Sequence, residues 1–189
     1  MGTNMDYQAV IGYYYKEDTP LRKVLVAHSR AVAARALLIC DRHPELGLDR
    51  GFLEAAAMLH DIGIIRCDAP GIHCHGTEPY ICHGRLGGEM LRRVPQCFPE
   101  GNAEPYARVC ERHTGAGLTR REILAQGLPL PLQDFLPETL EEQVVCYADK
   151  FYSKTHLDRE KTVEQAARSL EKFGAEGVER FRRWARLFE

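Results

Sequence analysis

The sequence predicts an all-α protein in which roughly seven helices surround a metal site. Apolar residues recur at helical spacing along most of the chain, whereas strand-like alternation is almost absent. The most apolar segment, 55–65, nevertheless contains a histidine and an aspartate side by side. A buried carboxylate is unfavourable unless it is paired or bound to a cation, and this indicates a metal site among the helices. With 189 residues, the chain is long enough for a single domain with a sizeable core.

The first two helices are predicted near the N-terminus. Residues 6–15 form a short, aromatic-rich segment that suits a helix. Thr19 and Pro20 then supply an N-cap and a proline at the first helical position. The helix that begins at Leu21 carries one apolar stripe and ends before Pro44. The stripe consists of Val24, Leu25, Val32, Ala36 and Ile39.

The central helices follow Asp49, which is a predicted N-cap. The helix over 52–65 is apolar nearly all round, so we expect it to lie in the centre of the domain. A loop over 67–82, rich in glycine, proline, histidine and cysteine, separates it from the next helix. Further helices are predicted over 83–94 and 103–113.

Two capping boxes mark later helix starts, one formed by Thr119 with Glu122 and the other by Thr139 with Glu142. The first box opens a short helix that Gly127 ends. Between the two helices the chain forms a proline-rich connection.

The helix that follows the second box is predicted to extend to about Lys154. One or two amphipathic helices then occupy 162–189. We therefore expect one domain, 1–189, with a core over 21–155 and a C-terminal helical extension over 156–189.

Composition limits the classes of partner. The formal net charge of −2 gives no general electrostatic reason to bind nucleic acid or a membrane surface. No apolar run approaches the ~20 residues of a membrane helix, and the N-terminus lacks the pattern of a secretory signal. The seven cysteines are odd in number and scattered, which favours free thiols in a reducing cytoplasm. We expect a cytoplasmic protein whose partner is a small molecule.

Six polar residues stand on apolar stripes where core residues are expected. Each one alone also fits a hydrogen-bonded core residue, but six of them, from several helices, are better explained by one cationic site. Imidazole and carboxylate ligands suit Mn, Fe, Co, Ni or Zn, and the carboxylates also suit Mg. The six residues are His28, His60, Asp61, His83, His113 and Asp149.

The adjacent pair His60 and Asp61 has a geometric consequence. Neighbours on a helix point about 100° apart, so both reach one ion only if it lies between their directions. Gly63 leaves room for another helix or a loop to approach this point. A carboxylate, unlike a single imidazole nitrogen, can bridge two ions through its two oxygens.

The order of these residues resembles the defining pattern of the HD superfamily of metal-dependent phosphohydrolases. Residues 60–63 read HDIG, which is similar to a variant of that motif, and His83 with His113 matches the subgroup that holds two metals. The segment 113–149 resembles a prokaryotic subfamily of HDIG-containing proteins and, more distantly, bacterial dinucleoside tetraphosphate hydrolases. The resemblance covers about 21–155.

The resemblance implies two divalent transition-metal ions (Fe, Mn, Co, Ni or Zn, with Mg as a further option). It assigns the first ion to His28, His60, Asp61 and Asp149. It assigns the second ion to His83 and His113, with Asp61 as the bridging ligand.

The resemblance also implies hydrolysis of a nucleotide or another small phosphate ester or anhydride. We expect hydroxide that bridges the ions to attack phosphorus in line, with Asp61 as a catalytic residue. Many relatives carry Lys or Arg after the HDIG glycine, where this chain has Ile64 and then, two residues on, Arg66. For Lys150, a structural salt bridge is the alternative to a catalytic role. The candidate substrate contacts are Arg66, Arg85, Lys150, Lys154 and Thr114.

Three alternatives remain open from the sequence. Some HD-fold proteins use a di-iron form of this ligand set to activate oxygen, so an oxygenase is the second hypothesis. A catalytically silent nucleotide-binding or signalling domain is the third. Within the loop over 67–82, the cysteines and histidines suggest either a lid over the active site, a plain loop or a small structural zinc site, whose spacing matches no established ligand pattern.

Overall fold

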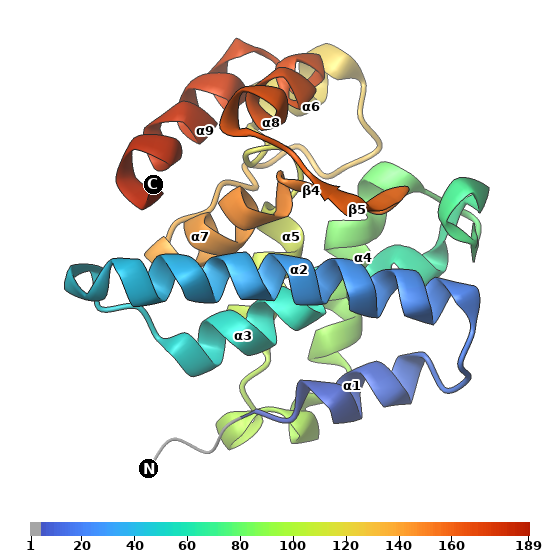
Figure 1. Cartoon of the computed structure of the whole chain (residues 1–189). Coiled ribbons are helices and arrows are strands. Elements are labelled where there is room, and N and C mark those ends of the chain that lie inside the picture. Colours follow the sequence, from blue (N-terminus) through green and yellow to red (C-terminus); the bar gives the residue numbers. More distant parts are fainter. Residues whose placement is uncertain (1–4) are drawn as a thin grey trace.

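The computed structural model describes residues 5–189, and in that range it contains nine α-helices and five short strands (Figure 1). The prediction of an all-α fold is confirmed, with more helices than the seven or so expected. The helices are α1 (Tyr7–Tyr14), α2 (Pro20–Arg42), α3 (Arg50–Leu59), α4 (His83–Arg92), α5 (Glu104–Arg112), α6 (Arg120–Gln126), α7 (Leu140–Asp149), α8 (Val163–Ser169) and α9 (Ala175–Phe188). The strands are β1 (Cys67–Ala69), β2 (Cys74–His75), β3 (Glu78–Pro79), β4 (Tyr152–Ser153) and β5 (His156–Glu160).

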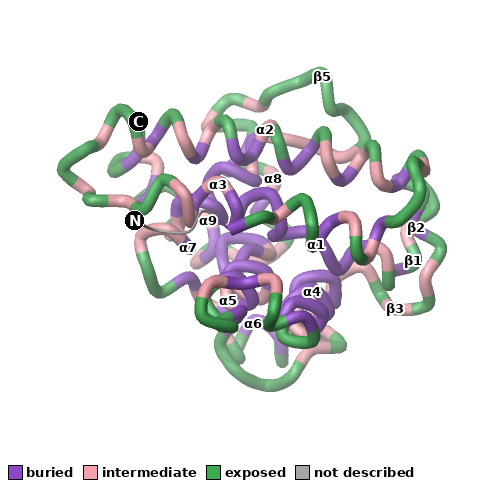
Figure 2. The backbone as a smooth tube through the Cα atoms, turned by 90° about the horizontal axis from the view of Figure 1, so that it is seen from below, coloured by how far each residue is buried: buried purple, intermediate pink, exposed green. Residues whose placement is uncertain are grey.

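Helix α2 is the long element against which α3 and α7 pack (Figure 1). The Thr19 hydroxyl accepts a hydrogen bond from the Arg22 amide at 3.2 Å, and Pro20 occupies the first turn, so the predicted helix start is confirmed. The buried face of α2 includes Leu25, His28 and Val32. In Figure 2, buried residues concentrate where α3, α4, α5 and α7 meet beneath this helix. No helix in the described range is both long and apolar enough to cross a membrane.

The helix predicted over 52–65 is shorter than expected. Helix α3 ends at Leu59, and a 3-10 turn over Ile62–Arg66 follows. An added Cβ at Gly63 would lie 2.1 Å from the His83 carbonyl oxygen, so the backbone of this turn lies directly against α4. The tighter turn therefore brings the end of α3 to the start of α4, and Asp61 lies at the break between them. This close approach confirms the room that Gly63 was expected to provide.

Glycines also allow α4 and α5 to approach closely. An added Cβ at Gly84 would lie 2.4 Å from the carbonyl oxygen of Cys110, and one at Gly87 would lie 3.3 Å from the Cys110 Cβ. Any larger side chain at Gly84 would force the two helices apart. This contact fixes the distance between His83, at the start of α4, and His113, which directly follows α5.

Helix α7 begins where predicted and ends earlier. The Thr139 hydroxyl accepts a hydrogen bond from the Glu142 amide at 3.1 Å, which confirms the N-cap. The Glu142 carboxylate does not complete the capping box: it accepts instead from the Glu138 amide at 2.7 Å and from Arg108 at 2.9 Å. The helix ends at Asp149 rather than near Lys154, because the chain turns there into the antiparallel hairpin β4–β5.

The C-terminal segment packs on α7. The break between α8 and α9 falls at Gly174, whose φ of 110° favours glycine. On the buried side, the Tyr147 and Phe181 rings stack with centroids 4.9 Å apart. Figure 1 shows α6, α8 and α9 together on the side of the molecule opposite α1.

The loop over 67–82 is an ordered wall with its own small sheet. Strand β1 pairs antiparallel with β2 and parallel with β3, and short 3-10 turns complete the segment. The sequence did not indicate these short strands within the predicted loop. Its strands have only two or three residues each, too few for an alternating pattern to show in the sequence.

Candidate metal centre

The six polar residues singled out in the sequence come together at one place. They reach it from the middle of α2, the end of α3, the start of α4, the end of α5 and the end of α7, and all six are buried. Their side-chain donor atoms form two groups, within each of which the atoms lie no more than 4.8 Å apart. The first group is His28, His60, Asp61 and Asp149, and the second is Asp61, His83 and His113.

The first group is arranged around one oxygen of each carboxylate. His28 Nε2 lies 2.9 Å from Asp149 Oδ1 and 3.2 Å from Asp61 Oδ2. His60 Nε2 lies 3.2 Å from the same Asp61 oxygen and 3.4 Å from the same Asp149 oxygen. Two imidazole nitrogens and two carboxylate oxygens thus surround one point.

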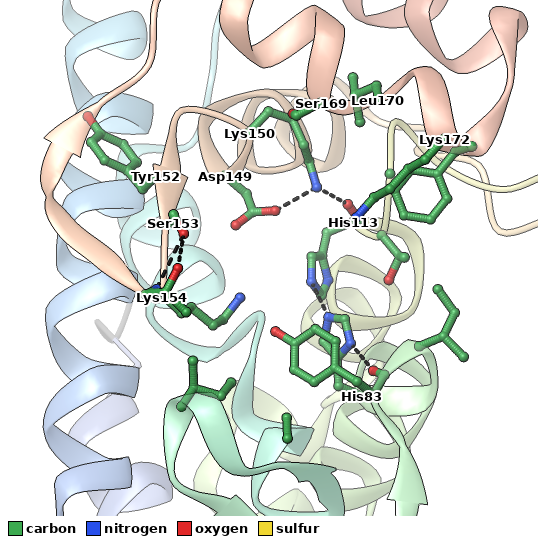
Figure 3. A pocket seen from close by; sticks show the side chains of 18 of the residues that line it. His83, His113, Asp149, Lys150, Tyr152, Ser153, Lys154, Ser169, Leu170 and Lys172 are labelled. Carbon is green, nitrogen blue, oxygen red and sulfur yellow. Dashed lines mark hydrogen bonds and ion pairs between the residues drawn. The ribbon is translucent and has the colours of Figure 1, made fainter.

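The second group uses the other oxygen of Asp61. Both His83 Nε2 and His113 Nε2 lie 3.4 Å from Asp61 Oδ1, and the two nitrogens are 3.0 Å apart. The two oxygens of one carboxylate therefore face different groups, which is the geometry of a bridging ligand. Figure 3 shows the His83 and His113 rings pointing toward each other from α4 and α5.

Backbone carbonyls orient three of the four imidazoles. Nδ1 of His60 lies 2.6 Å from the Ala57 oxygen, and Nδ1 of His83 lies 2.6 Å from the Tyr80 oxygen. Nδ1 of His113 lies 2.7 Å from the oxygen of Cys110. Since a carbonyl only accepts, each Nδ1 carries the proton and donates it. With Nδ1 held in this way, each ring directs Nε2 into the centre, as metal-bound histidines commonly do.

The electrostatics of the second group favour a bound cation. Burial and the neighbouring His113 lower the pKa of His83 to about 3. Burial also lowers the pKa of His113, so both rings are neutral at pH 7. Two lone pairs then face each other across 3.0 Å with no proton between them. A divalent ion between these nitrogens and Asp61 Oδ1 removes that repulsion.

In the first group the carboxylates dominate. Burial alone lowers the pKa of His60, but Asp61 and Asp149 outweigh burial and raise it to about 9. For Asp61 burial acts in the opposite direction and raises the pKa. The positive charges of Lys154 and His60 nevertheless hold the pKa of Asp61 well below its ordinary value. The two carboxylates thus stabilise positive charge beside them, on His60 and on Lys154.

Unsatisfied buried atoms show that the residues fit a metal. His60 Nε2 and Asp61 Oδ1 are buried and have no hydrogen-bond partner, and Asp61 Oδ2 has an ion pair with Lys154 at 2.6 Å but no hydrogen bond. Such groups are costly to bury, and coordination to a cation satisfies them. Imidazole with carboxylate is a donor set for divalent transition metals, so two ions fit the two groups.

Two lysines at the rim pair with the carboxylates. Lys150 Nζ donates to Asp149 Oδ2 at 2.6 Å and to the His113 carbonyl oxygen at 2.8 Å (Figure 3). The salt bridge considered for Lys150 is therefore present. Lys154 Nζ lies 2.6 Å from Asp61 Oδ2. Both ammonium groups thus stand beside the metal ligands, at the edge of an open cavity.

That cavity opens from the metal centre and has a volume of about 650 Å³. Its walls include His83, His113, Asp149 and the expected Thr114, Lys150 and Lys154. Arg66 and Arg85, the other expected substrate contacts, are not among the lining residues. Arg66 is exposed at the end of the 3-10 turn, and Arg85 pairs with Glu89 one turn further along α4. The shortened α3 turns Arg66 away, which the expectation of a continuous helix did not anticipate.

Other lining residues were missed by the sequence reasoning. Tyr80, from the loop over 67–82, stacks on His83 with ring centroids 4.6 Å apart, and Lys154 Nζ lies 5.9 Å from the centre of its ring. Lys161 and Lys172 come from the C-terminal segment. None of the three lies on an apolar helical stripe, so periodicity gave no signal for them.

The cysteines and histidines of the loop over 67–82 form no metal group of this kind in the described part of the chain. The loop instead contributes one wall of the cavity, through Ala69, Gly71, Ile72, Tyr80 and Ile81. This placement favours the interpretation of the loop as a lid beside the candidate metal centre over a small structural zinc site.

Comparison with known proteins agrees with this geometry. The model of the HD domain family matches residues 25–153, and the chain belongs to that family. The uncharacterized protein MJ0778 of Methanocaldococcus jannaschii is 36% identical over 127 residues, which are 66% of this chain and 64% of that protein. A tRNA (cytidine(56)-2'-O)-methyltransferase of Picrophilus torridus is 33% identical over 134 residues, 71% of this chain and 33% of that protein. The chain thus spans between one third and two thirds of these relatives.

Solved structures show the same fold at low identity. The HD domain of the L. monocytogenes phosphodiesterase PgpH aligns with a TM-score of 0.50 and 14% identity, over 88% of this chain and 94% of that one. The same domain in complex with cyclic-di-AMP aligns with a TM-score of 0.51 and 13% identity, over 96% and 95%.

Proposed function

We propose that this protein is a metal-dependent phosphohydrolase that acts on a nucleotide or another small phosphate ester or anhydride. The observation that carries the proposal is the position of Asp61, whose two oxygens face two separate groups of histidine and aspartate side chains. A bridging carboxylate between two histidine-rich groups is the arrangement of a two-metal hydrolytic site. The identification with HDIG-containing hydrolases forms part of this proposal.

Each residue of the centre has a defined part in the proposal. When bound, two divalent ions supply water activated near neutral pH and stabilise charge on phosphoryl oxygens. His28, His60, Asp61 and Asp149 would hold one ion, and His83, His113 and Asp61 the other. The carbonyl bonds to Nδ1 keep three of these rings in the required tautomer and direction.

The rim residues would bind and orient the substrate. Lys150 and Lys154 lie beside the metal ligands and line the cavity, so their ammonium groups can contact phosphoryl oxygens. Thr114 lines the same cavity and can donate a hydrogen bond from its hydroxyl. In the overall reaction water adds across a P–O bond, and the leaving oxygen takes up a proton.

The form of the cavity supports a nucleotide-sized substrate. Its volume of about 650 Å³ lies within the ordinary range of small-molecule sites. Tyr80, Tyr152 and Phe173 supply aromatic surface next to the lysines, a combination that suits a base together with its phosphate. The complex of the PgpH domain with cyclic-di-AMP supports a nucleotide for this chain as well.

The test is phosphate release from a panel of nucleotides, dinucleoside polyphosphates and sugar phosphates with Mn, Fe, Co, Ni or Mg. We expect metal-dependent turnover by the natural protein and a loss on the order of 100-fold or more in Asp61→Asn. Asp68→Asn is the matched control, because Asp68 is an exposed aspartate outside the metal groups. Oxygen uptake by the iron-loaded protein without phosphate release would instead establish the di-iron oxygenase. Nucleotide binding by metal-loaded protein without any turnover would establish the silent binding domain.

A further inference from the structure

The lysines around the cavity fall into two pairs with different surroundings. Four lysines and one carboxylate, Asp149, line it, although the chain as a whole has a net charge of −2. Lys150 and Lys154, at the metal centre, are each 2.6 Å from a carboxylate oxygen. Lys161 and Lys172 form none of the ion pairs found among residues 5–189.

The unpaired lysines come from the C-terminal segment. Lys161 lies between β5 and α8, where its amide donates to the Phe151 carbonyl oxygen at 2.8 Å and closes the β4–β5 hairpin. Lys172 belongs to the 3-10 turn Glu171–Phe173, between α8 and α9. Both follow residue 153, the last that the HD family model matches. This part of the wall therefore lies outside the residues that the family model matches.

All four lysines line the same cavity, so each adds positive charge to it. Burial lowers the pKa of Lys161 most, Asp149 partly offsets this, and Lys150, Lys172 and Lys154 lower it further. A group of like charges without counter-ions is relieved when an anion binds among them. Figure 3 shows Lys172 across the cavity from Lys154, with Lys150 between them.

We propose that Lys161 and Lys172 form a second anion site on the outer wall of the cavity, which binds a phosphate group of the substrate other than the one that is hydrolysed. This inference rests on the proposed function and narrows it: the substrate carries at least two phosphate groups. Lys150 and Lys154 form ion pairs with Asp149 and Asp61. Of the four lysines that line the cavity, Lys161 and Lys172 are therefore the two whose charge is not balanced by an ion pair among residues 5–189. Lysine is a common phosphate ligand, and two of them at one wall favour a dianionic group.

The experiment compares two probes that differ by one phosphate, adenosine 5′-monophosphate and adenosine 3′,5′-bisphosphate. Binding is measured by calorimetry with the natural protein in EDTA, so that no hydrolysis occurs. We expect the bisphosphate to bind about tenfold more tightly than the monophosphate. In the double variant Lys161→Gln/Lys172→Gln we expect that preference to disappear, while affinity for the monophosphate changes less than about twofold.

The matched control is Lys16→Gln/Lys23→Gln, which removes the same charge from lysines outside this cavity and should keep the tenfold preference. The single variants Lys161→Gln and Lys172→Gln, each expected to lose about threefold, provide the test if the double variant does not fold. Equal binding of both probes by the natural protein, absence of binding, or a preference that survives in the double variant overturns the second anion site. Because EDTA removes turnover from the measurement, a preference without later metal-dependent hydrolysis would contradict the proposed function and leave this site standing.

Discussion

Asp61 occupies the point where the two metal groups meet, and a glycine two residues further on controls how it is placed. The turn over Ile62–Arg66 passes so close to α4 that an added Cβ at Gly63 would lie 2.1 Å from the His83 oxygen and 2.4 Å from the Gly87 nitrogen. Those are backbone atoms of the helix that carries the second group, so neither can move aside independently. The contact between Gly63 and α4 thus positions both Asp61, which faces the two groups, and α4, which carries His83 of the second group.

Gly63→Ala should therefore destabilise the protein. We expect the free energy of unfolding to fall by about 2–4 kcal/mol, since the new methyl group must push the turn away from α4. Urea unfolding followed by circular dichroism measures this. Gly12→Ala is the matched control, because an added Cβ at Gly12 in α1 meets no atom within 4 Å. Its expected effect is none or a gain of up to about 1 kcal/mol, and an equal loss in both variants would contradict the steric argument.

For individual residues, the sequence predicts the buried His/Asp cluster better than it predicts the residues that line the cavity. His28 and His60 stand on apolar stripes, where burial of a polar group needs an explanation, and this made them visible. Lysines at a cavity rim, such as Lys161 and Lys172, lie in segments where a charged residue is ordinary. Arg66 is placed outside the cavity by the end of α3, a local turn that no periodic pattern encodes. The helical periodicity of apolar residues therefore predicts buried polar side chains, but it gives no signal for residues that line the cavity.

Between elements, an arginine ties α4 to α5 outside the core. Arg92 Nε donates to Glu104 Oε2 at 2.8 Å, and Nη2 donates to Glu104 Oε1 at 2.9 Å. These bonds to Arg92 lower the pKa of Glu104 below its ordinary value of 4.5, and burial offsets only part of the effect. The pair links the two helices that carry His83 and His113.

The contribution of this pair should depend on pH. A carboxylate whose pKa is depressed in the folded state stabilises the fold above its unfolded pKa and loses that effect as the pH falls through the folded value. At pH 7 we expect Glu104→Gln to cost about 0.2–1 kcal/mol, the range for exposed ion pairs, since 52% of the Glu104 side chain is exposed. Below the folded pKa of Glu104 the variant and the natural protein should be equally stable.

Denaturant unfolding of both proteins from pH 7 to about pH 3 measures this difference. Glu179→Gln, an exposed glutamate on α9, provides the control and should show little effect at any pH. A cost for Glu104→Gln that stays constant as the pH falls would show that the pair does not act through its charge.

Helix starts were easier to predict than helix ends. Thr19, Asp49, Thr119 and Thr139 each cap the helix that the sequence assigned to them. The ends of α3 and α7 came earlier than predicted, because tertiary contacts rather than a local signal end them. At α7 the chain leaves directly after the ligand Asp149 and forms the hairpin that carries Lys154 to the rim.

For the whole molecule, the C-terminal segment completes the cavity that the family domain begins. The C-terminal segment packs on α7 through Tyr147 and Phe181, and its Lys161 and Lys172 line the cavity together with His83, His113 and Asp149. The sequence indicated helices here, but long-range packing decides which wall they form. The division into a core and an extension that we propose has a functional meaning: the core would bind metal, and the extension would select the substrate.

The most direct test of the central claim, that Asp61 is shared by two metal groups, is the number of Mn²⁺ ions bound per chain. Calorimetric titration of metal-free protein, checked by elemental analysis, should give two ions for the natural protein. His83→Gln/His113→Gln should give one, Asp61→Asn should weaken both sites, and the variant His156→Gln, at an exposed histidine outside the metal groups, should still give two. A single ion in the natural protein, or two ions retained without His83 and His113, would contradict the shared two-metal centre.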